Sequence, residues 1–306
     1  MPTSPEEFAA IPQPMKQTIE VAIIGAGRLG TALSLALSRQ GYYIRTIVSR
    51  TPASAKRLAR LFPAAKPLAF SQLKSLTVPD LLFITTPDDQ ISAVAEVLET
   101  LEVPQRKQPV ALHTSGALSS AAISGLSKHG WQVGSLHPLL SISDLGHKVN
   151  FDGAYWCIEG QPLAQRRAKA LVRRLKGKSF SIGLEYKSLY HAAAVMASGN
   201  VVSVFDVAIE MLTTCGLSKS ESKQILVPLL ESTVQSLEDK ATAAVLTGPF
   251  ARGDLETIKL HLEALGQVKD EEIVELYRIL GRRSLKLSAS AGLNTATAKK
   301  IKRILE

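Results

Sequence analysis

The stretch Gly25-Ala26-Gly27-Arg28-Leu29-Gly30 decides the fold of this 306-residue chain. It follows a β-branched apolar run at residues 19–24 and opens an amphipathic helix expected over residues 29–39. In a G-x-G-x-x-G loop between a strand and a helix, the first glycine permits the tight turn. The second admits a pyrophosphate close to the backbone, and the third lets the helix pack against the strand. Because the N–H groups at the helix start attract phosphates, this context predicts a dinucleotide site rather than a turn without a ligand.

Short apolar runs alternate with helical patterns as far as about residue 184. The runs lie at residues 19–24, 43–48, 81–85, 110–113, 132–136, 154–158 and 179–182, and the helices expected between them at 29–39, 53–61, 90–101, 119–128 and 162–176. Most runs are continuous, as expected of strands buried on both faces. The order predicts an α/β domain at residues 18–184 with a doubly wound, Rossmann-type parallel sheet. The last two runs are candidates for antiparallel additions at its edge.

After residue 184 the strand-like runs disappear. Apolar residues then recur at intervals of three and four over residues 184–214, 219–237, 255–265 and 271–289. This spacing predicts an all-helical C-terminal domain at residues 185–306, which we expect to contribute to the substrate site and to dimerisation. Its long apolar helices need a partner surface, so we expect a homodimer. Residues 1–17 are expected to form an extended leader.

Composition excludes several classes of protein. Two cysteines among 306 residues are too few for a disulfide framework or a zinc ribbon, and we expect no metal. No apolar run approaches the roughly 18 residues of a transmembrane helix, so we expect no membrane span. The leader carries Glu6 and Glu7 where a secretory signal has a basic start, which favours a cytoplasmic protein.

The chain is basic, with 36 Lys and Arg against 27 Asp and Glu and a net charge of +9. The basic residues are dispersed among apolar ones at helical spacing, and only 5% of residues are aromatic, which leaves few platforms for stacking bases. We therefore expect no nucleic-acid partner. Attraction of a phosphorylated cofactor is a more economical use of the charge.

The second strand of the predicted sheet indicates which dinucleotide binds. An NAD site usually carries Asp or Glu at the end of this strand, but the sequence has no carboxylate between Glu20 and Asp80. The strand instead ends in Ser49-Arg50-Thr51. A guanidinium with two neighbouring hydroxyls suits a 2′-phosphate, which predicts NADP as the cofactor. The alternative is that these are ordinary surface residues.

Polar residues also follow the next three strands, where ligands bind in such sheets. Thr85, Thr86 and Pro87 are expected to line the cofactor ribose. His113-Thr114-Ser115-Gly116 and His137 come after the two strands that follow. We expect Ser115 and His137 to bind substrate and His113 to act in catalysis. A histidine at either position can orient a carboxylate, donate a proton or cap a turn.

Two segments of the helical part carry further candidates. Lys187 and His191 are four residues apart and share one helix face, with Tyr190 beside them, so Lys187 or His191 is a candidate proton donor. The alternative is a tightly packed interdomain helix with a solvated lysine. Farther along, Asp254 is expected to cap a helix and Arg252 to reach an anionic substrate.

Four motifs together resemble a known family. They are HTSGALSS at residues 113–120, SLHPL at 135–139, KxxYHxAA from Lys187 and GPxxRGD at 248–254. They are similar to a bacterial Rossmann-like oxidoreductase family with a C-terminal helical domain of unknown function. That family lies within the superfamily of pyrroline-5-carboxylate reductase, ketopantoate reductase and the β-hydroxyacid dehydrogenases. The last group is expected to carry Lys-x-x-x-Asn on the first long helix, whereas this chain has His191 four residues after Lys187.

The resemblance implies an NADPH-dependent reductase of a small, carboxylate-bearing carbonyl or imine compound. A ketopantoate-like 2-keto acid is the favoured substrate and a cyclic imine the next. The departure at His191 leaves Lys187, Tyr190 and His191 all open as the proton donor. The alternative is a non-catalytic NADP-binding protein that senses redox state or binds a partner, because a fold does not by itself define a function.

Overall fold

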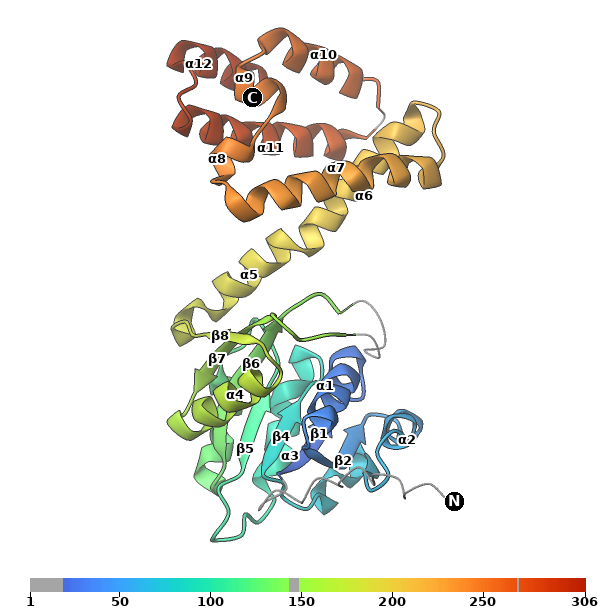
Figure 1. Cartoon of the computed structure of the whole chain (residues 1–306), viewed down its shortest axis with the longest axis vertical. Helices are drawn as coiled ribbons and strands as arrows, with labels where there is room; N and C mark the ends of the chain where they lie inside the picture. The colour runs from blue at the N-terminus through green and yellow to red at the C-terminus, as the bar shows by residue number, and fades with distance from the viewer. Residues whose placement is uncertain (1–18, 143–148, 269) are drawn as a thin grey trace, which may run out of the picture. The chain divides into compact units, whose positions relative to one another are not determined.

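The computed structural model describes residues 19–142, 149–268 and 270–306. The chain divides into two compact units after Ser198 (Figure 1). The predicted leader at residues 1–17 lies outside the described residues.

The first unit is built on an eight-stranded sheet of order β3-β2-β1-β4-β5-β6-β7-β8. Its strands are β1 (Glu20–Ile24), β2 (Tyr43–Ser49), β3 (Lys66–Ala69), β4 (Leu81–Ile84), β5 (Val110–His113), β6 (Gln132–Leu139), β7 (Tyr155–Gly160) and β8 (Lys178–Phe180). Strands β1 to β6 pair in parallel, β7 pairs antiparallel with β6, and β8 runs parallel to β7. This confirms the doubly wound sheet and the antiparallel character of its last two strands. Strand β3 was not predicted, because its four residues include Pro67, which is tolerated only at a sheet edge.

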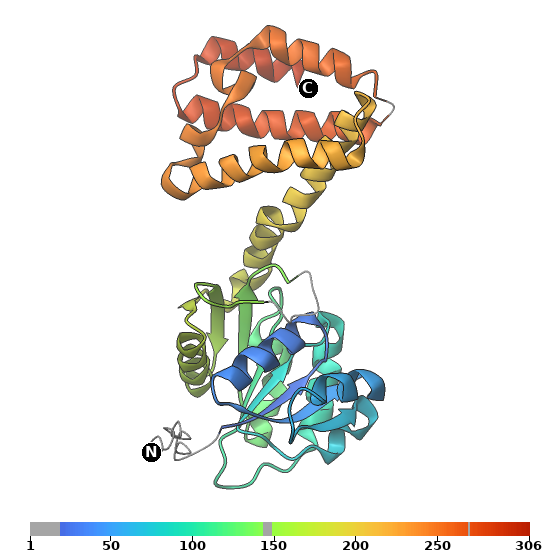
Figure 2. The same ribbon diagram turned by 45° about the vertical axis from the view of Figure 1, so that its right-hand side comes forward.

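Helices cover both faces of this sheet (Figures 1 and 2). The helices of the first unit are α1 (Arg28–Arg39), α2 (Pro52–Ala59), η1 (Phe70–Ser75), η2 (Asp88–Gln90), α3 (Ile91–Glu99), η3 (Ser120–His129), α4 (Pro162–Arg174), η4 (Leu184–Tyr186) and α5 (Lys187–Ala197), and of these α5 runs away from the sheet. Apolar residues of α1, α2 and α4 form one buried cluster with the sheet, and those of η1, α3 and η3 form a second. The strands are therefore buried on both sides, which explains their continuous apolar runs.

One predicted helix has a different geometry. The segment expected as an α-helix at residues 119–128 is the 3₁₀ helix η3, which is interrupted at Ile123 by non-helical dihedral angles (φ −124°, ψ 19°). The segment contains four serines and Gly125. Serine side chains compete for backbone hydrogen bonds and glycine disfavours helix, so a regular α-helix is weakly supported here.

The second unit is entirely helical over its described residues. It comprises α6 (Gly199–Thr214), α7 (Lys219–Asp239), α8 (Thr242–Val245), α9 (Gly248–Arg252), α10 (Leu255–Leu265), α11 (Glu271–Ser290) and α12 (Thr295–Ile304). Its small core contains Ile258, Leu285, Ile301 and Leu305, from α10, α11 and the end of α12. Helix α7 pairs with α6.

The division of the chain differs from the predicted boundary at residue 184. Helix α5 was assigned to the helical domain, but it belongs to the first compact unit. The reason is visible in its first residue, since Lys187 is only 1% exposed and bonds to β6 and to the loop after β5. Apolar periodicity identifies a helix but does not show which domain it packs against.

The helical stretch Leu184–Thr214 is long and apolar enough to cross a membrane by length and composition alone, with a mean hydropathy of 1.7. This segment was not predicted from the sequence, because polar residues such as Lys187, His191 and Asn200 divide it into shorter apolar runs. Helices of soluble proteins pass the same test. None of the most apolar 18-residue window within Leu184–Thr214 is buried, so this window forms exposed apolar surface that needs an explanation.

Candidate functional site

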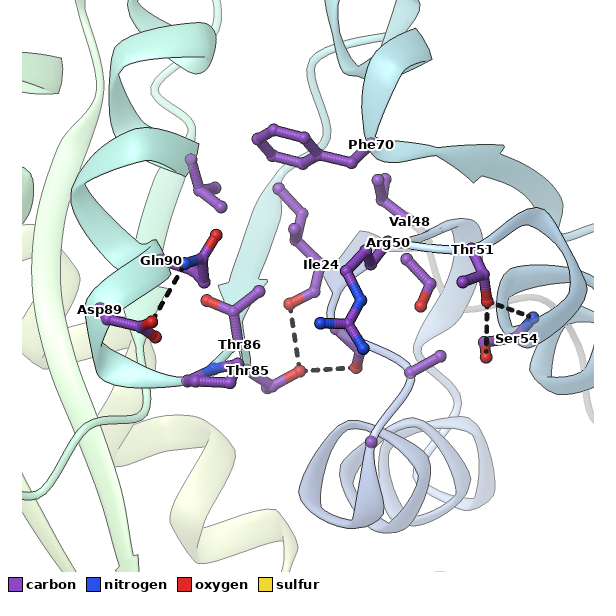
Figure 3. A pocket seen from close by; sticks show the side chains of 16 residues that line it. Ile24, Val48, Arg50, Thr51, Ser54, Phe70, Thr85, Thr86, Asp89 and Gln90 are labelled. Carbon is purple, nitrogen blue, oxygen red and sulfur yellow. Dashed lines mark hydrogen bonds between the residues drawn. The ribbon is translucent and has the colours of Figure 1, made fainter.

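A pocket of about 500 Å³ lies at the carboxyl ends of β1, β2 and β4 (Figure 3). The lining residues are Ile24, Gly25, Ala26, Gly27, Val48, Ser49, Arg50, Thr51, Ser54, Phe70, Thr85, Thr86, Pro87, Asp89, Gln90 and Val94. The structure thus brings together nine of the twelve residues predicted to bind cofactor. The other three, Arg28, Leu29 and Gly30, stand at the start of α1 outside this lining set.

The glycine loop is held in a tight turn at the floor of the pocket. Gly25 has a φ of 117°, which favours glycine, and its N–H donates to the Val48 carbonyl at 2.8 Å. The Thr85 hydroxyl donates to the Gly25 carbonyl at 2.7 Å (Figure 3). A side chain at Gly30 would collide with that same carbonyl, so Gly30 allows α1 to approach the turn. By contrast, a Cβ at Gly27 meets no atom within 4 Å among the described residues.

The second strand ends in a set of anion-binding groups. The Arg50 guanidinium points into the pocket (Figure 3). Thr51 is the N-cap of α2, and its hydroxyl accepts from the Ser54 N–H at 3.3 Å and donates to the Ser54 hydroxyl at 3.0 Å. Ser54 also lines the pocket and was not predicted. A helix N-terminus, a guanidinium and hydroxyls together suit a phosphate.

The remaining lining of the pocket, which includes Phe70, Thr86 and Val94, also suits a dinucleotide. Thr86 lines the pocket, and its buried hydroxyl oxygen has no hydrogen-bond partner in the described part of the chain. Phe70 and Val94 provide apolar lining of the kind that a base needs, and sequence analysis did not find them. They lie outside the glycine motif and the strand ends, where an apolar residue carries no recognisable signal.

A second group of polar residues lies at the ends of β5 and β6. The Nδ1 atom of His137 and the Tyr190 hydroxyl are 2.8 Å apart, and the rings of His137 and His191 meet edge-on with centroids 5.6 Å apart. Gly116 fits between the two imidazoles, because a Cβ there would lie 2.9 Å from His137 Nε2 and would overlap His191 Nδ1. We call His137, Tyr190 and His191 the His–Tyr cluster.

Two members of the His–Tyr cluster, His137 and Tyr190, are neutral around pH 7. Burial, with smaller contributions from the charges of Lys187, His191 and His113, lowers the pKa of His137 to about 4. Burial raises the pKa of the Tyr190 phenol above its usual range. The described residues include no group of three or more His, Cys, Asp or Glu side chains placed to hold a metal ion.

Two expected catalytic residues are enclosed in the protein. Lys187 is 1% exposed, and its Nζ donates to the Ser115 carbonyl at 3.2 Å and to the Ser135 hydroxyl at 3.0 Å. Burial lowers its pKa. His113 is fully buried, accepts at Nδ1 from the Ser115 N–H at 3.3 Å, and burial lowers its pKa to about 4. The alternative of a solvated Lys187 does not match this geometry, because spacing places a residue on a helix face without showing what covers it. The catalytic roles of Lys187 and His113 stay predictions.

Ser115, expected at the substrate, has its hydroxyl fully engaged. It donates to the Asp88 carboxylate at 2.7 Å and accepts from the Ala117 and Leu118 N–H groups at 3.1 and 2.9 Å. Asp88 directly follows Pro87, which lines the pocket. Ser115 therefore connects the cofactor pocket to the loop that carries Gly116.

Glu159 on β7 is a buried residue of this region that sequence analysis missed. It is 3% exposed, and its carboxylate accepts from the Ser120 N–H at 2.7 Å and from the Ser120 hydroxyl at 2.6 Å. A carboxylate inside an apolar strand was the available signal, because such a residue is seldom buried without a specific partner.

The second unit holds the remaining candidate. Asp254 caps α10 as expected, with its carboxylate accepting from the Thr257 N–H at 3.1 Å. Arg252 ends the short helix α9 and is exposed. Its role in binding an anionic substrate stays a prediction.

Comparison with known protein families identifies the two domains of the chain. Residues 3–138 match the model of a Rossmann-like domain, and residues 154–284 match that of a domain of unknown function, DUF2520. The chain therefore combines a Rossmann-like domain with a DUF2520 domain, which confirms the resemblance.

Individual proteins are similar over most of their length. A curated relative, the glycerol-3-phosphate dehydrogenase [NAD(P)+] of Orientia tsutsugamushi, is 23% identical over 76% of this chain and 70% of its own. A solved protein of Bacteroides fragilis assigned as an NADP oxidoreductase is 25% identical over 88% and 98% of the two chains, with a TM-score of 0.70. Two further solved structures share the fold. An imine reductase from Pseudomonas is 16% identical over 94% of this chain and 100% of its own, with a TM-score of 0.65. A pyrroline-5-carboxylate reductase from Coxiella burnetii is 12% identical over 93% of this chain and 99% of its own, with a TM-score of 0.57.

The two glycines of the loop are predicted to respond differently to alanine. Gly27→Ala leaves the melting temperature unchanged, because its Cβ meets open space, but weakens NADPH binding at least about tenfold because the methyl group occupies the path of the pyrophosphate. Gly30→Ala lowers the melting temperature by several degrees, because its Cβ collides with the Gly25 carbonyl. Thermal unfolding and a fluorescence titration with NADPH check both. Unchanged NADPH affinity in Gly27→Ala would contradict the assignment of the loop.

Proposed function

We propose that this protein is an NADPH-dependent reductase of a small, carboxylate-bearing carbonyl or imine compound. The observation that carries the proposal is a short connection between two sites. Pro87 lines the pocket, and the next residue, Asp88, bonds to Ser115, whose neighbour Gly116 lies against the His–Tyr cluster. A dinucleotide pocket and a neutral proton-donating pair are thus separated by a single loop.

Several features support NADP over NAD. Arg50 and the capped start of α2 provide positive potential where the adenosine ribose is expected, at the end of the second strand. Strand β2 ends in Ser49 and not in a carboxylate that would accept from the ribose hydroxyls. The similarity to an NADP oxidoreductase adds independent support.

The chemistry assigned to the chain is binding, orientation and proton supply. When bound, NADPH supplies the hydride, which is the cofactor's own chemistry. Tyr190 is held by His137 and keeps its proton around pH 7, so it is the residue we assign to protonate the carbonyl oxygen or to hydrogen-bond the imine nitrogen. His191 lies beside this pair, with its ring edge-on to that of His137, and we assign it to the same substrate site.

The substrate class is the finer part of the proposal. Similarity in fold to an imine reductase and to a pyrroline-5-carboxylate reductase supports a C=N or C=O substrate with a carboxylate. A ketopantoate-like 2-keto acid remains our first compound class to test, and a cyclic imine our second. His137 is the residue we assign to the substrate carboxylate, and a role of Arg252 in binding an anionic substrate stays a prediction. The competing hypothesis of a non-catalytic NADP-binding protein draws on the enclosure of Lys187 and His113.

We also propose that the protein is a cytoplasmic homodimer without nucleic-acid or membrane partners. Helix α6 has no buried residue in the monomer, and α6 and α7 expose seven large apolar side chains, which are Val201, Val202, Val204, Ile225, Leu229, Val234 and Leu237. A second copy would remove this surface from water. Cys215 is an exposed free thiol, which suits a reducing compartment.

The cofactor preference predicts a selective effect of Arg50→Ala. Losing the guanidinium should weaken NADPH binding by about tenfold or more, because a charge-assisted hydrogen bond contributes roughly 1.5–3 kcal/mol, and leave NADH binding unchanged. Titration of both nucleotides by nicotinamide fluorescence measures this, with Lys74→Ala as an exposed cationic control. Equal affinity for both nucleotides in the unmodified protein would overturn the preference.

Turnover separates an enzyme from a binding protein. In a screen of 2-keto acids and cyclic imines followed by NADPH oxidation, Tyr190→Phe should lower kcat about 100-fold, because general acid catalysis typically contributes 10²–10⁴-fold. NADPH affinity should stay within about threefold, since Tyr190 does not line the pocket. Tyr186→Phe, 56% exposed and four residues earlier, is the control. If Tyr190→Phe kept full turnover, Tyr190 would not be the proton donor.

The dimer is tested by light scattering. The unmodified chain should give about twice 32.9 kDa at micromolar concentration. Leu229→Glu on α7 should give the monomer mass, because a charge in an apolar interface is costly. Leu260→Glu on α10 is a matched control, since the two leucines are 64% and 63% exposed. A monomer mass for the unmodified protein would contradict the proposal.

A further inference from the structure

The loop at residues 115–120 is held at both ends by buried charged side chains. At its start, Lys187 Nζ donates to the Ser115 carbonyl at 3.2 Å. At its end, the Glu159 carboxylate accepts from the Ser120 N–H at 2.7 Å and from the Ser120 hydroxyl at 2.6 Å. The lysine is 1% exposed and the glutamate 3%. Charge-assisted hydrogen bonds in such an environment are strong and directional.

The two charged residues are close to one another through Ser135. Ser135 on β6 is the direct antiparallel partner of Glu159 on β7, so both side chains project from the same face of the sheet. Lys187 Nζ donates to the Ser135 hydroxyl at 3.0 Å. Burial lowers the pKa of Lys187, and the negative charges of Glu159 and Asp88 act against that shift. Each charge thus partly compensates the other inside the protein.

The loop between these residues sets the spacing of the two halves of the site. The Ser115 hydroxyl holds Asp88, next to the cofactor pocket, at 2.7 Å. Gly116 occupies the space between the imidazoles of His137 and His191. A displacement of the loop therefore changes the position of the His–Tyr cluster relative to the cofactor pocket. An error of about 1 Å in such a position can cost about 100-fold in rate.

We propose that Glu159 and Lys187 are a pair of positioning residues that hold loop 115–120 and thereby align the His–Tyr cluster with the cofactor pocket. Lys187 acts through the Ser115 carbonyl and not as the proton donor. Glu159 has no role in any assignment made from sequence. The catalytic consequence rests on the proposed reductase function, whereas the ordering of the loop does not.

The first experiment compares Glu159→Ala and Glu159→Gln, with Glu102→Ala as an exposed carboxylate control. Hydrogen–deuterium exchange across residues 114–122 should rise at least about tenfold in Glu159→Ala, because both Ser120 hydrogen bonds are lost. Glu159→Gln should restore slow exchange at Ser120, because the amide carbonyl still accepts from its N–H. Exchange in Glu102→Ala should match that of the unmodified protein.

Kinetics distinguishes positioning from a purely structural role. With any substrate that the unmodified protein reduces, Glu159→Ala should lower kcat about 10- to 100-fold while the NADPH dissociation constant stays within about threefold, since Glu159 does not line the cofactor pocket. Glu159→Gln should recover at least half of the lost kcat on a logarithmic scale. An unchanged kcat in folded Glu159→Ala would overturn the positioning role.

A double-variant cycle tests the pairing of the charges. Lys187→Met and Glu159→Gln should each lower the melting temperature, because each leaves an uncompensated buried charge. The double variant should lose less than the sum of the two losses, because both charges are gone. Strictly additive losses in melting temperature would show that the two charges act independently, which would contradict the proposal that Glu159 and Lys187 act as a pair.

The outcomes separate this inference from the proposed function. Absence of turnover with every substrate in the screen would count against the reductase, while the exchange and melting experiments would still decide whether the pair orders the loop. Turnover in the unmodified protein with unchanged exchange in Glu159→Ala would count against the positioning pair alone.

Discussion

The close approach of helix α1 to the turn after β1 is the constraint on which the first unit depends. The Gly25 carbonyl lies where a side chain on residue 30 would have to be, and the Thr85 hydroxyl holds that carbonyl from the neighbouring strand at 2.7 Å. These contacts place the start of α1 directly above the pocket floor. Gly25, Ala26 and Gly27 of this turn line the pocket, and the first N–H groups of a helix have no acceptor within the helix and attract phosphates.

Desolvation governs the other half of the site. His113, His137 and Lys187 all have lowered pKa values, and burial is the largest cause in each case. Burial therefore favours the neutral forms of the His113 and His137 imidazoles and of the Tyr190 phenol. The charges that remain, on Lys187 and Glu159, are held by hydrogen bonds to the loop, as buried charges must be.

The order of strands and helices and most of the cofactor pocket could be predicted from local sequence. Buried parallel strands have continuous apolar runs, and a glycine loop between a strand and a helix has a specific mechanism. Phe70 and Val94 could not be predicted, because an apolar residue that lines a pocket has the same pattern as one that fills a core. Glu159 and Ser135 could not be paired either, since they meet only through the antiparallel register of β6 and β7.

The sequence by itself determined the class of fold, the position of the glycine loop and the presence of Arg50 in place of a carboxylate, because each depends on residues adjacent in the chain. Only the tertiary structure decided that Lys187 is enclosed and that Tyr190 bonds to His137, 53 residues away in the chain. Helical spacing specifies which residues share a face. What covers that face depends on how distant strands and loops pack, and this packing sets the burial and hydrogen bonds that define the chemistry of each side chain.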